Sequence, residues 1–444
     1  MDEADNQIAP TDDTDSKPAN WLQPAGKPAI PVTPPPDNPR PAPRYSPGVG
    51  IALVVGLAGP VLACVLSALL ITLPRAANQQ ELPLIVSIFL AVGGLGLPLA
   101  WHAWLRMRGR ARAAWQTHGW WLAASGALIV LMMVCGQLSI SLNWLPTLVL
   151  APLQPLIFIA AAAVVLTFTA GGWNGLSRLR AWGHLISGAW LSIFLSFVAE
   201  VLVIGAFGLV ILIALAVIMP DQVMEFAQTY RSVEDLDLNT VIGWVLQPWV
   251  IVLAFILGSM VVPMIEELIK PIGVVVLIGR RPAPMAAFVG GMMGGLGFAV
   301  TETLGNLATI ANPWLVLIMA RMGTLVMHSL TAGLVGWGWG QMAAKRPWRW
   351  VGAYAGAVAI HGLWNGLAVA TVFIGLYFQR TPQPNTALAA ILGLVMIICL
   401  FTFLLLVAAC VAGLGLMGYW LRRDGGRQTA DDPPIALATA STLQ

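Results

Sequence analysis

Long apolar runs occupy most of this sequence from Gly50 to Tyr419 and constrain its fold more than any other feature. An α-helix needs about 20 apolar residues to cross the hydrocarbon core of a bilayer, and runs of that length recur along the chain. With 58% hydrophobic and 10% charged residues, these segments are unable to form the water-facing surface of a soluble domain. The sequence therefore predicts an all-α, polytopic transmembrane helical bundle in a lipid bilayer.

About ten membrane spans follow from the apolar runs. Two of them, 185–219 and 241–279, are too long for one straight crossing, so each is predicted to contain a hairpin or a kinked, protruding helix. Pro248 and Pro263 are the expected break points in the second. The predicted spans are 50–73, 82–104, 120–141, 147–170, 185–219, 241–279, 284–310, 314–340, 350–375 and 387–420.

The chain divides into five segments on this pattern. Residues 1–49 are polar and rich in proline, so they bury too little apolar surface to offset chain entropy, and residues 422–444 are similar. Both tails are predicted to be disordered. Between them we expect N-terminal transmembrane helices with an external acidic loop at 50–240, a transmembrane core at 241–375, and a last transmembrane helix at 376–421.

Basic residues mark every second loop and predict the orientation. Cytoplasmic loops are enriched in arginine and lysine. The loops after the even-numbered spans are therefore expected to be cytoplasmic, and with them both termini of a multi-pass protein of the cell membrane. Nucleic acid is not an expected partner, because the arginines lie in short loops and form no large basic face. The basic residues that follow spans two, four, six, eight and ten are Arg106, Arg108, Arg110, Arg112, Arg178, Arg180, Arg280, Arg281, Lys345, Arg346, Arg349, Arg422 and Arg423.

Ionisable residues are concentrated in spans six to nine. A charged group in hydrocarbon is costly unless it is paired or lies in a wet cavity, so each one requires an explanation. The first five spans contain Glu200, which we expect to lie outside any site, and His102 near an end. The concentration in the later spans indicates a functional site within the membrane. These spans contain Glu266, Glu267, Lys270, Glu302, Arg321, His328 and His361.

Helical spacing places some of these residues on shared faces. Glu266 and Lys270 are four residues apart and share a face, whereas Glu267 points about 100° away. In a purely structural interpretation Glu266 and Lys270 neutralise each other, which leaves Glu267 without a partner. His361 and Asn365 share a face in the same way.

The depth of these residues in the bilayer can be counted from the basic ends of the spans. At about 1.5 Å per residue, Glu266, Glu302, His328 and His361 fall in the middle or outer half of the hydrocarbon core. Glu302 belongs to a span whose run GGMMGGLG permits close approach to neighbouring helices. We therefore expect the four side chains to share a cavity that opens toward the outside.

Four short motifs in this region resemble those of the PrsW family of intramembrane proteases, which is related to CAAX-processing and bacteriocin-processing membrane proteases. Their order and spacing match over about residues 258–370. Two positions depart from the family pattern, namely Thr303, where Asn is usual, and Asn365, where Asp is frequent. The motifs are the run Glu266-Glu267-Leu268-Ile269-Lys270, the spacing from Phe298 to Glu302, His328, and His361 with Asn365.

The resemblance implies a catalytic core that hydrolyses a peptide bond in a membrane-anchored protein, such as an anti-sigma factor. This reaction needs an activated water, donors for the oxyanion and an acid for the leaving amine. Glu266 or Glu267 is the candidate base, and His361 with Asn365 would hold the water or stabilise the oxyanion. The remaining candidates are His328 as a further catalytic residue and Lys270, Phe298, Glu302 and Arg321 as supporting or substrate-binding residues.

Other interpretations stay open. A divalent metal such as zinc held by His328, His361 and a glutamate, for which Glu302 is the candidate, would leave another glutamate as the base. No HExxH-type spacing indicates a metal directly. An ion-coupled transporter or channel also uses carboxylates and histidines in the membrane, although the two halves show no inverted repeat. A catalytically inactive membrane scaffold would retain these residues without using them.

The basic loops predict the result of a topology experiment. A reporter fused after Arg112, Arg180 or Arg423 should lie in the cytoplasm, because these residues belong to the positively charged loops. A reporter fused near Glu234, in the acidic loop, should lie outside. Paired fusions of a reporter active only outside and one active only inside would measure this, and an external signal after Arg180 would contradict the orientation.

Overall fold

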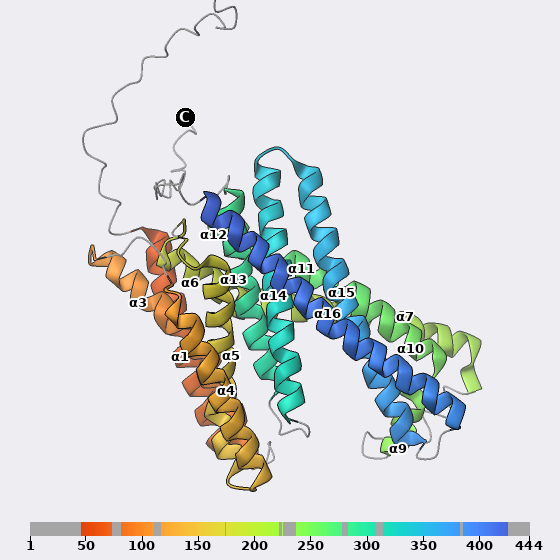
Figure 1. The fold of residues 1–444 in the computed structure, drawn as a ribbon. Coiled ribbons are helices and arrows are strands. Elements are labelled where there is room, and N and C mark those ends of the chain that lie inside the picture. The colour runs from red at the N-terminus through yellow and green to blue at the C-terminus, as the bar shows by residue number, and fades with distance from the viewer. Residues whose placement is uncertain are drawn as a thin grey trace, which may run out of the picture. The chain divides into compact units, whose positions relative to one another are not determined.

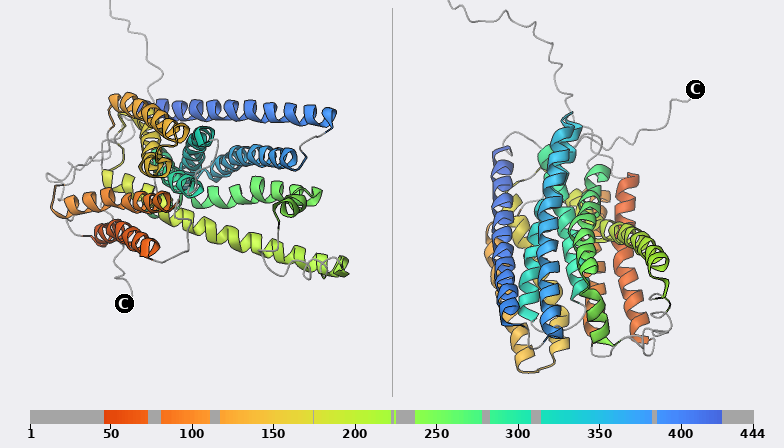
Figure 2. Two further views of the ribbon diagram at one scale, coloured as in Figure 1. Left: turned by 90° about the horizontal axis from the view of Figure 1, so that it is seen from below. Right: turned by 90° about the vertical axis from the view of Figure 1, so that its right-hand side faces the viewer.

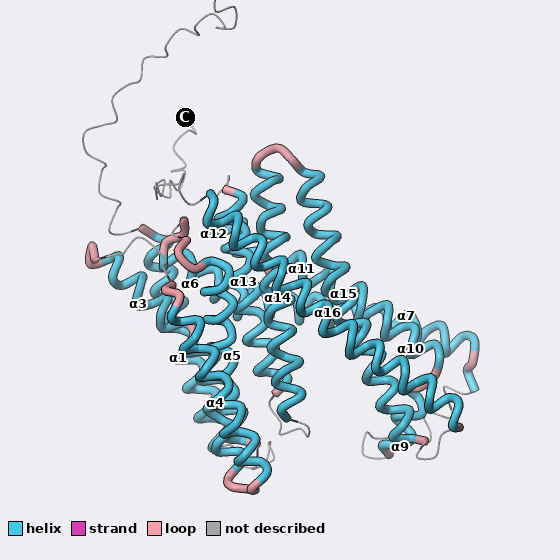
Figure 3. Tube along the Cα trace, viewed as in Figure 1, coloured by secondary structure: helices cyan, strands magenta, loops and turns pink. Residues whose placement is uncertain are grey.

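The computed structural model describes residues 46–72, 81–110, 117–173, 175–221, 224, 237–277, 283–307, 314–381 and 385–424, which all belong to one compact unit. Throughout these ranges the regular structure is helical (Figure 3). Ten helical runs among the described residues are long and apolar enough to cross a membrane. The predicted helical membrane bundle and its ten spans are therefore confirmed.

The ends of the helical region differ from the prediction by a few residues. The first helix begins at Pro47, inside the predicted tail, because proline fits the first turn of a helix. The last helix continues to Asp424 and includes Arg422 and Arg423, whose charges are favourable at a helix C-terminus. The rest of both predicted tails and most of the predicted acidic loop lie outside the described residues.

The helices α1 to α5 form the N-terminal part of the described unit (Figure 1). α1 packs against α2 and α3, while α5 packs against α4 and α2. The helices α2 and α3 are separated only by Leu95 and together make one span. Their bounds are α1 (Pro47–Thr72), α2 (Leu82–Gly94), α3 (Gly96–Met107), α4 (Trp120–Ser141) and α5 (Pro146–Ala170).

The first long span is a continuous helical run of 41 residues, which excludes the hairpin and agrees with the other predicted alternative, a single long helix that protrudes. It consists of α6 (Arg178–Ile186), the π-helix η1 (Ser187–Ser192) and α7 (Ile193–Ile218). The run begins at residue 178 because the Ser177 hydroxyl caps the first turn by accepting a hydrogen bond from the Arg180 amide. A π segment contains one extra residue within a helix without ending it.

The second long span is interrupted at Pro248, as predicted, where α9 ends and α10 begins. At the other predicted break point the chain stays helical: Pro263 is the second residue of α11, which directly continues a second π segment. An unpredicted break at Pro271 separates α11 from α12, because proline lacks the amide that would continue the helix. The segments are α9 (Leu238–Val245), α10 (Pro248–Ile256), η3 (Leu257–Val261), α11 (Val262–Ile269) and α12 (Ile272–Leu277).

The break at Pro271 is held by a neighbouring helix. The hydroxyl of Ser192, in η1, donates to the carbonyls of Ile269 and Lys270 at 3.2 and 3.3 Å. Backbone carbonyls at a helix end in hydrocarbon need such partners, since water is not available there. This contact sets the position of the C-terminal end of α11.

The buried centre of the unit is α13 (Pro284–Asn306), which packs against α14 (Trp314–Ala343), η1, α6 and α5 (Figures 1 and 2). Two glycines explain this close packing. A Cβ atom on Gly295 would overlap the His328 carbonyl of α14, and one on Gly297 would overlap the Leu185 carbonyl of α6. The predicted close approach of this glycine-rich helix is therefore confirmed.

Two long helices complete the chain, α15 (Pro347–Arg380) and α16 (Thr386–Asp424). α15 packs against α14, η3 and α11, and α16 contacts α15, α5 and α14. In Figures 1 and 2, α16 runs obliquely to α13 and α14. A helix of 39 residues is longer than the hydrocarbon core is thick, so it has to tilt or protrude.

The packing of α13 predicts a position-dependent effect of alanine. Gly295→Ala should lower stability by about 1–3 kcal/mol, because the added methyl group meets the backbone of α14. Gly305→Ala on the same helix is the matched control, since nothing lies within 4 Å of its Cβ position. Thermal unfolding of both purified variants in one detergent would compare them, and equal midpoints would contradict this account of the packing.

Candidate active site

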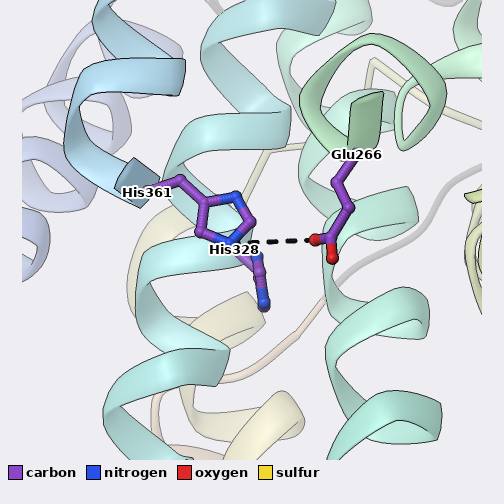
Figure 4. A group of neighbouring side chains, drawn as sticks. All are labelled: Glu266, His328 and His361. Carbon is purple, nitrogen blue, oxygen red and sulfur yellow. Dashed lines mark ion pairs between the residues drawn. The ribbon is translucent and has the colours of Figure 1, made fainter. Parts of the chain in front are cut away.

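Ionisable side chains from three helices meet beside α13. Glu266 and Glu267 lie on α11 and Lys270 directly follows it, while His328 comes from α14 and His361 from α15. Figure 4 shows Glu266, His328 and His361 pointing toward one another. We call these five residues, with Glu302 of α13, the charged cluster. Residues separated by almost a hundred positions in the sequence thus come within contact distance.

The ammonium group of Lys270 lies at the centre of the charged cluster. Its Nζ atom is 2.8 Å from Glu266 Oε2 and 2.7 Å from Glu267 Oε1. On the other side it lies 2.7 Å from His328 Nδ1 and 3.5 Å from His361 Nδ1. One cation therefore joins two carboxylates of its own helix to a histidine from each of two other helices.

The prediction that Glu267 lacks a partner is wrong. Its Oε1 atom accepts from Lys270 and lies 2.9 Å from His361 Nδ1. The flexible lysine side chain contacts both preceding carboxylates, three and four residues back, and not only Glu266 on its own helix face.

A second chain of contacts extends the cluster to its edge. His328 Nε2 lies 3.0 Å from Glu302 Oε2, and Arg321 of α14 donates to Glu302 Oε1 at 3.1 Å. His328 thus contacts Lys270 through one ring nitrogen and Glu302 through the other. Arg321 supplies a second permanent positive charge at the far end.

Burial differs between the centre and the edge of the cluster. The side chains of Glu267 and Lys270 are 0% exposed, whereas those of Glu302 and Arg321 are 27% and 21% exposed. Ion pairs and hydrogen bonds are stronger in such dry surroundings, and unpaired charges are more costly. The Glu302–Arg321 edge is therefore the more accessible part of the cluster.

Aromatic contacts orient the central groups. Lys270 Nζ lies 4.6 Å from the centre of the Phe298 ring, a cation–π contact. The Phe298 ring also meets His328 edge-on at 5.6 Å between ring centres, and His328 meets His361 in the same way at 4.8 Å. Phe298 accordingly supports the ammonium group and one histidine.

Asn365 makes its hydrogen bond away from the carboxylates. Its Nδ2 atom donates to the carbonyl of Gly258 in η3 at 2.9 Å. A π segment leaves carbonyls that need such partners. The bond fastens α15, which carries His361, to the segment that precedes Glu266 and Glu267.

Sequence reasoning missed the position of Glu200. This residue of α7 was expected to lie outside the site, yet its carboxyl group lies beside that of Glu266. A lone carboxylate in an apolar span needs a partner, and this requirement could have indicated from the sequence that Glu200 lies near other ionisable groups.

Sequence reasoning also placed His184 outside the spans. It precedes the predicted start of span five by one residue, whereas the structure includes it in α6. There it is fully buried and packs against Gly273 of α12.

Three residues of the cluster offer donor atoms suited to a metal ion. Glu266, His328 and His361 each supply one donor, and these atoms lie within 4.8 Å of one another (Figure 4). The glutamate differs from the predicted Glu302, which instead contacts the other nitrogen of His328. Two histidines and a glutamate are a donor set found in catalytic zinc sites. The donors thus fit zinc in type, but the Lys270 ammonium competes with a metal for the same atoms.

Comparison with protein families matches residues 195–407 to the model of the PrsW family intramembrane metalloproteases. The matched segment contains the whole charged cluster, Arg321, Asn365 and Glu200. The resemblance predicted from the four motifs is therefore confirmed, and the match extends beyond them on both sides. Comparisons with curated proteins and with solved structures gave no match.

The central position of Lys270 predicts a large effect on stability. Lys270→Met should destabilise the protein by about 3–5 kcal/mol, because it leaves two buried carboxylates without their cation. Adding Glu267→Gln should recover part of that loss by removing one of the two charges. Lys345→Met, in an exposed turn, is the control. Unfolding midpoints in detergent would test this, and a single variant as stable as the control would contradict it.

Proposed function

Residues 195–407 form a PrsW family intramembrane protease domain, and from this premise we propose that the charged cluster hydrolyses a peptide bond in a membrane-associated protein. The domain makes the chain a multi-pass membrane peptidase with a membrane protein as substrate. One observation carries the assignment to the cluster. The two carboxylates and the lysine of α11 and its end lie, in a buried place, within hydrogen-bonding distance of two histidines that come from two other helices. Such convergence of titratable groups is typical of catalytic sites.

Glu266 is the proposed base that activates water. Its side chain keeps 10% exposure, and its Oε2 atom is 3.8 Å from His361 Nε2, beyond a direct hydrogen bond. Glu267 is 0% exposed and bound by both Lys270 and His361, so its proposed role is to orient those two groups. The two neighbouring glutamates would therefore act differently.

Lys270 and His361 are the proposed electrophilic groups. The lysine places a permanent positive charge beside Glu266, where it would stabilise the oxyanion of the tetrahedral intermediate. Protonated His361 would keep Nδ1 on Glu267 and present Nε2 as the acid for the leaving amine. Asn365 would act indirectly, by holding α15 on the Gly258 carbonyl.

A metal-assisted version uses the same residues. When held by Glu266, His328 and His361, a zinc ion would supply a Lewis acid and lower the pKa of a bound water. Lys270 would then have to withdraw from Glu266 and His328, and Glu267 would be the remaining carboxylate beside the site. The position of the ammonium among the donor atoms favours the version without metal.

The accessible edge of the cluster is the proposed place of substrate entry. Glu302 and Arg321 lie near the ends of α13 and α14 that the basic loops predict to face outward. A single-pass protein of the cell membrane, such as an anti-sigma factor, would then be cut near its outer side. Both termini of the protease would be cytoplasmic.

The catalytic proposal predicts that Glu266→Gln lowers the cleavage rate by at least about 100-fold, because glutamine keeps the size of glutamate without its basicity. His361→Ala should have an effect of similar size. Glu81→Gln is the matched control, since this carboxylate precedes α2 and caps no helix. Glu200 is unsuitable as a control because it contacts Glu266.

The assay would use proteoliposomes and a membrane-tethered substrate, identified beforehand by comparing membrane-protein fragments in cells with and without the protein. All variants should first elute as single species in detergent. Cleavage by Glu266→Gln at nearly the wild-type rate would show that the proposed base is wrong. A protein that transports ions but cleaves no substrate would support the transporter alternative.

A further prediction concerns the dependence of activity on a metal ion. We expect activity to survive exhaustive chelation, because Lys270 supplies the positive charge at the place where a metal would bind. Purified wild type would be assayed before chelation, after it, and after return of zinc. Loss of activity that zinc restores would contradict this expectation and establish the metal-assisted version.

A further inference from the structure

A separate cavity of about 540 Å³ lies on the other side of α13 from the charged cluster. Its wall on α13 consists of Met293, Leu296, Gly297 and Val300. These residues follow helical spacing on one face, and at 100° per residue Phe298 and Glu302 fall on the opposite face. The cavity is therefore distinct from the proposed active site, although both use the same helix.

Away from the helix ends, the lining contributed by α5 and α13 is apolar. Ile159, Ala163 and Leu166 of α5 line the cavity together with Leu296 and Val300 of α13. Such a lining offers no hydrogen bonds to a polar molecule, so a hydrocarbon chain is the chemistry that fits. The volume lies within the range of about 300–1,000 Å³ found for ligand sites.

The other end of the cavity is polar and basic. His102 lies in α3 near its end, His118 just before α4, and Arg178 is the first residue of α6. All three thus lie where helices meet the basic loops. Trp121 and Trp182 line the same part, and tryptophan is enriched at the membrane–water boundary. Charge and aromatic rings therefore place this end at the level of lipid headgroups.

We propose that this cavity binds an acidic phospholipid. The phosphate would contact Arg178, with His102 and His118 beside it, and one acyl chain would lie between α5 and α13. A guanidinium group matches the geometry of a phosphate, and basic pockets between membrane helices are suited to anionic headgroups. The bound chain would touch the face of α13 opposite Phe298 and Glu302.

The test compares lipids on the purified full-length protein. Wild type in nanodiscs made of equal parts phosphatidylglycerol and phosphatidylcholine would be analysed by native mass spectrometry for retained lipid. We expect phosphatidylglycerol to be retained about tenfold over phosphatidylcholine, because both lipids carry the phosphate but the choline cation of phosphatidylcholine is repelled by Arg178. Equal retention of the two lipids would overturn the proposal without any variant.

Two variants locate the lipid. Arg178→Gln should remove the preference for phosphatidylglycerol, and Ala163→Trp should reduce its retention about tenfold by filling the apolar part. Arg423→Gln, which removes an exposed charge from the end of α16, should leave both unchanged. Unchanged retention in both cavity variants would assign the lipid to the outer surface and overturn the proposal.

Soluble glycerol phosphate and palmitate separate the two halves of the ligand. Neither should displace phosphatidylglycerol at equimolar concentration, because each makes only part of the proposed contacts. Displacement by palmitate alone would show that the site takes a fatty acid, and displacement by glycerol phosphate alone would show an anion site. Either result would overturn the phospholipid assignment.

Discussion

The interaction on which this structure depends is the one between the Lys270 ammonium and the acceptors around it. A single charge in a membrane bundle is costly, but this cation is paired with Glu266 and Glu267 and contacts His328. The pairing requires α11 and α14 to meet at one depth and in one rotation. Pro271 ends the helix directly after the lysine, and Ser192 holds the carbonyls at that end. The backbone thus sets where the charge lies.

α13 allows this arrangement because small residues let helices approach it on several sides. Gly295 meets the backbone of α14 at His328, and Gly297 meets α6 at Leu185. The same helix turns Phe298 and Glu302 toward the charged cluster and its opposite face toward the apolar cavity. Close packing of this kind transmits displacement rather than absorbing it. The charged cluster and the proposed lipid site therefore lie on opposite faces of one closely packed helix.

Much of the charged cluster was predictable because buried ionisable groups are costly and rarely occur without a reason. That principle and the four motifs were sufficient to indicate Glu266, Glu267, His328 and His361 from the amino-acid sequence. They did not indicate that one lysine would serve both glutamates. Helical spacing assigns a face to each residue, but a long flexible side chain reaches beyond its face. The contact between Glu200 and Glu266 joins helices whose mutual placement no motif describes.

The sequence by itself determined a helical membrane protein, because in hydrocarbon each long apolar segment has to satisfy its backbone hydrogen bonds internally. It also indicated which helices carry the buried ionisable residues. Only the tertiary structure decided which side chains meet: Lys270 between the carboxylates and the histidines, and Asn365 on Gly258 rather than beside the carboxylates. The physical reason is helix rotation. Each π segment, η1 and η3, inserts one residue and turns the following face by about 100°, and contacts between helices depend on that turn.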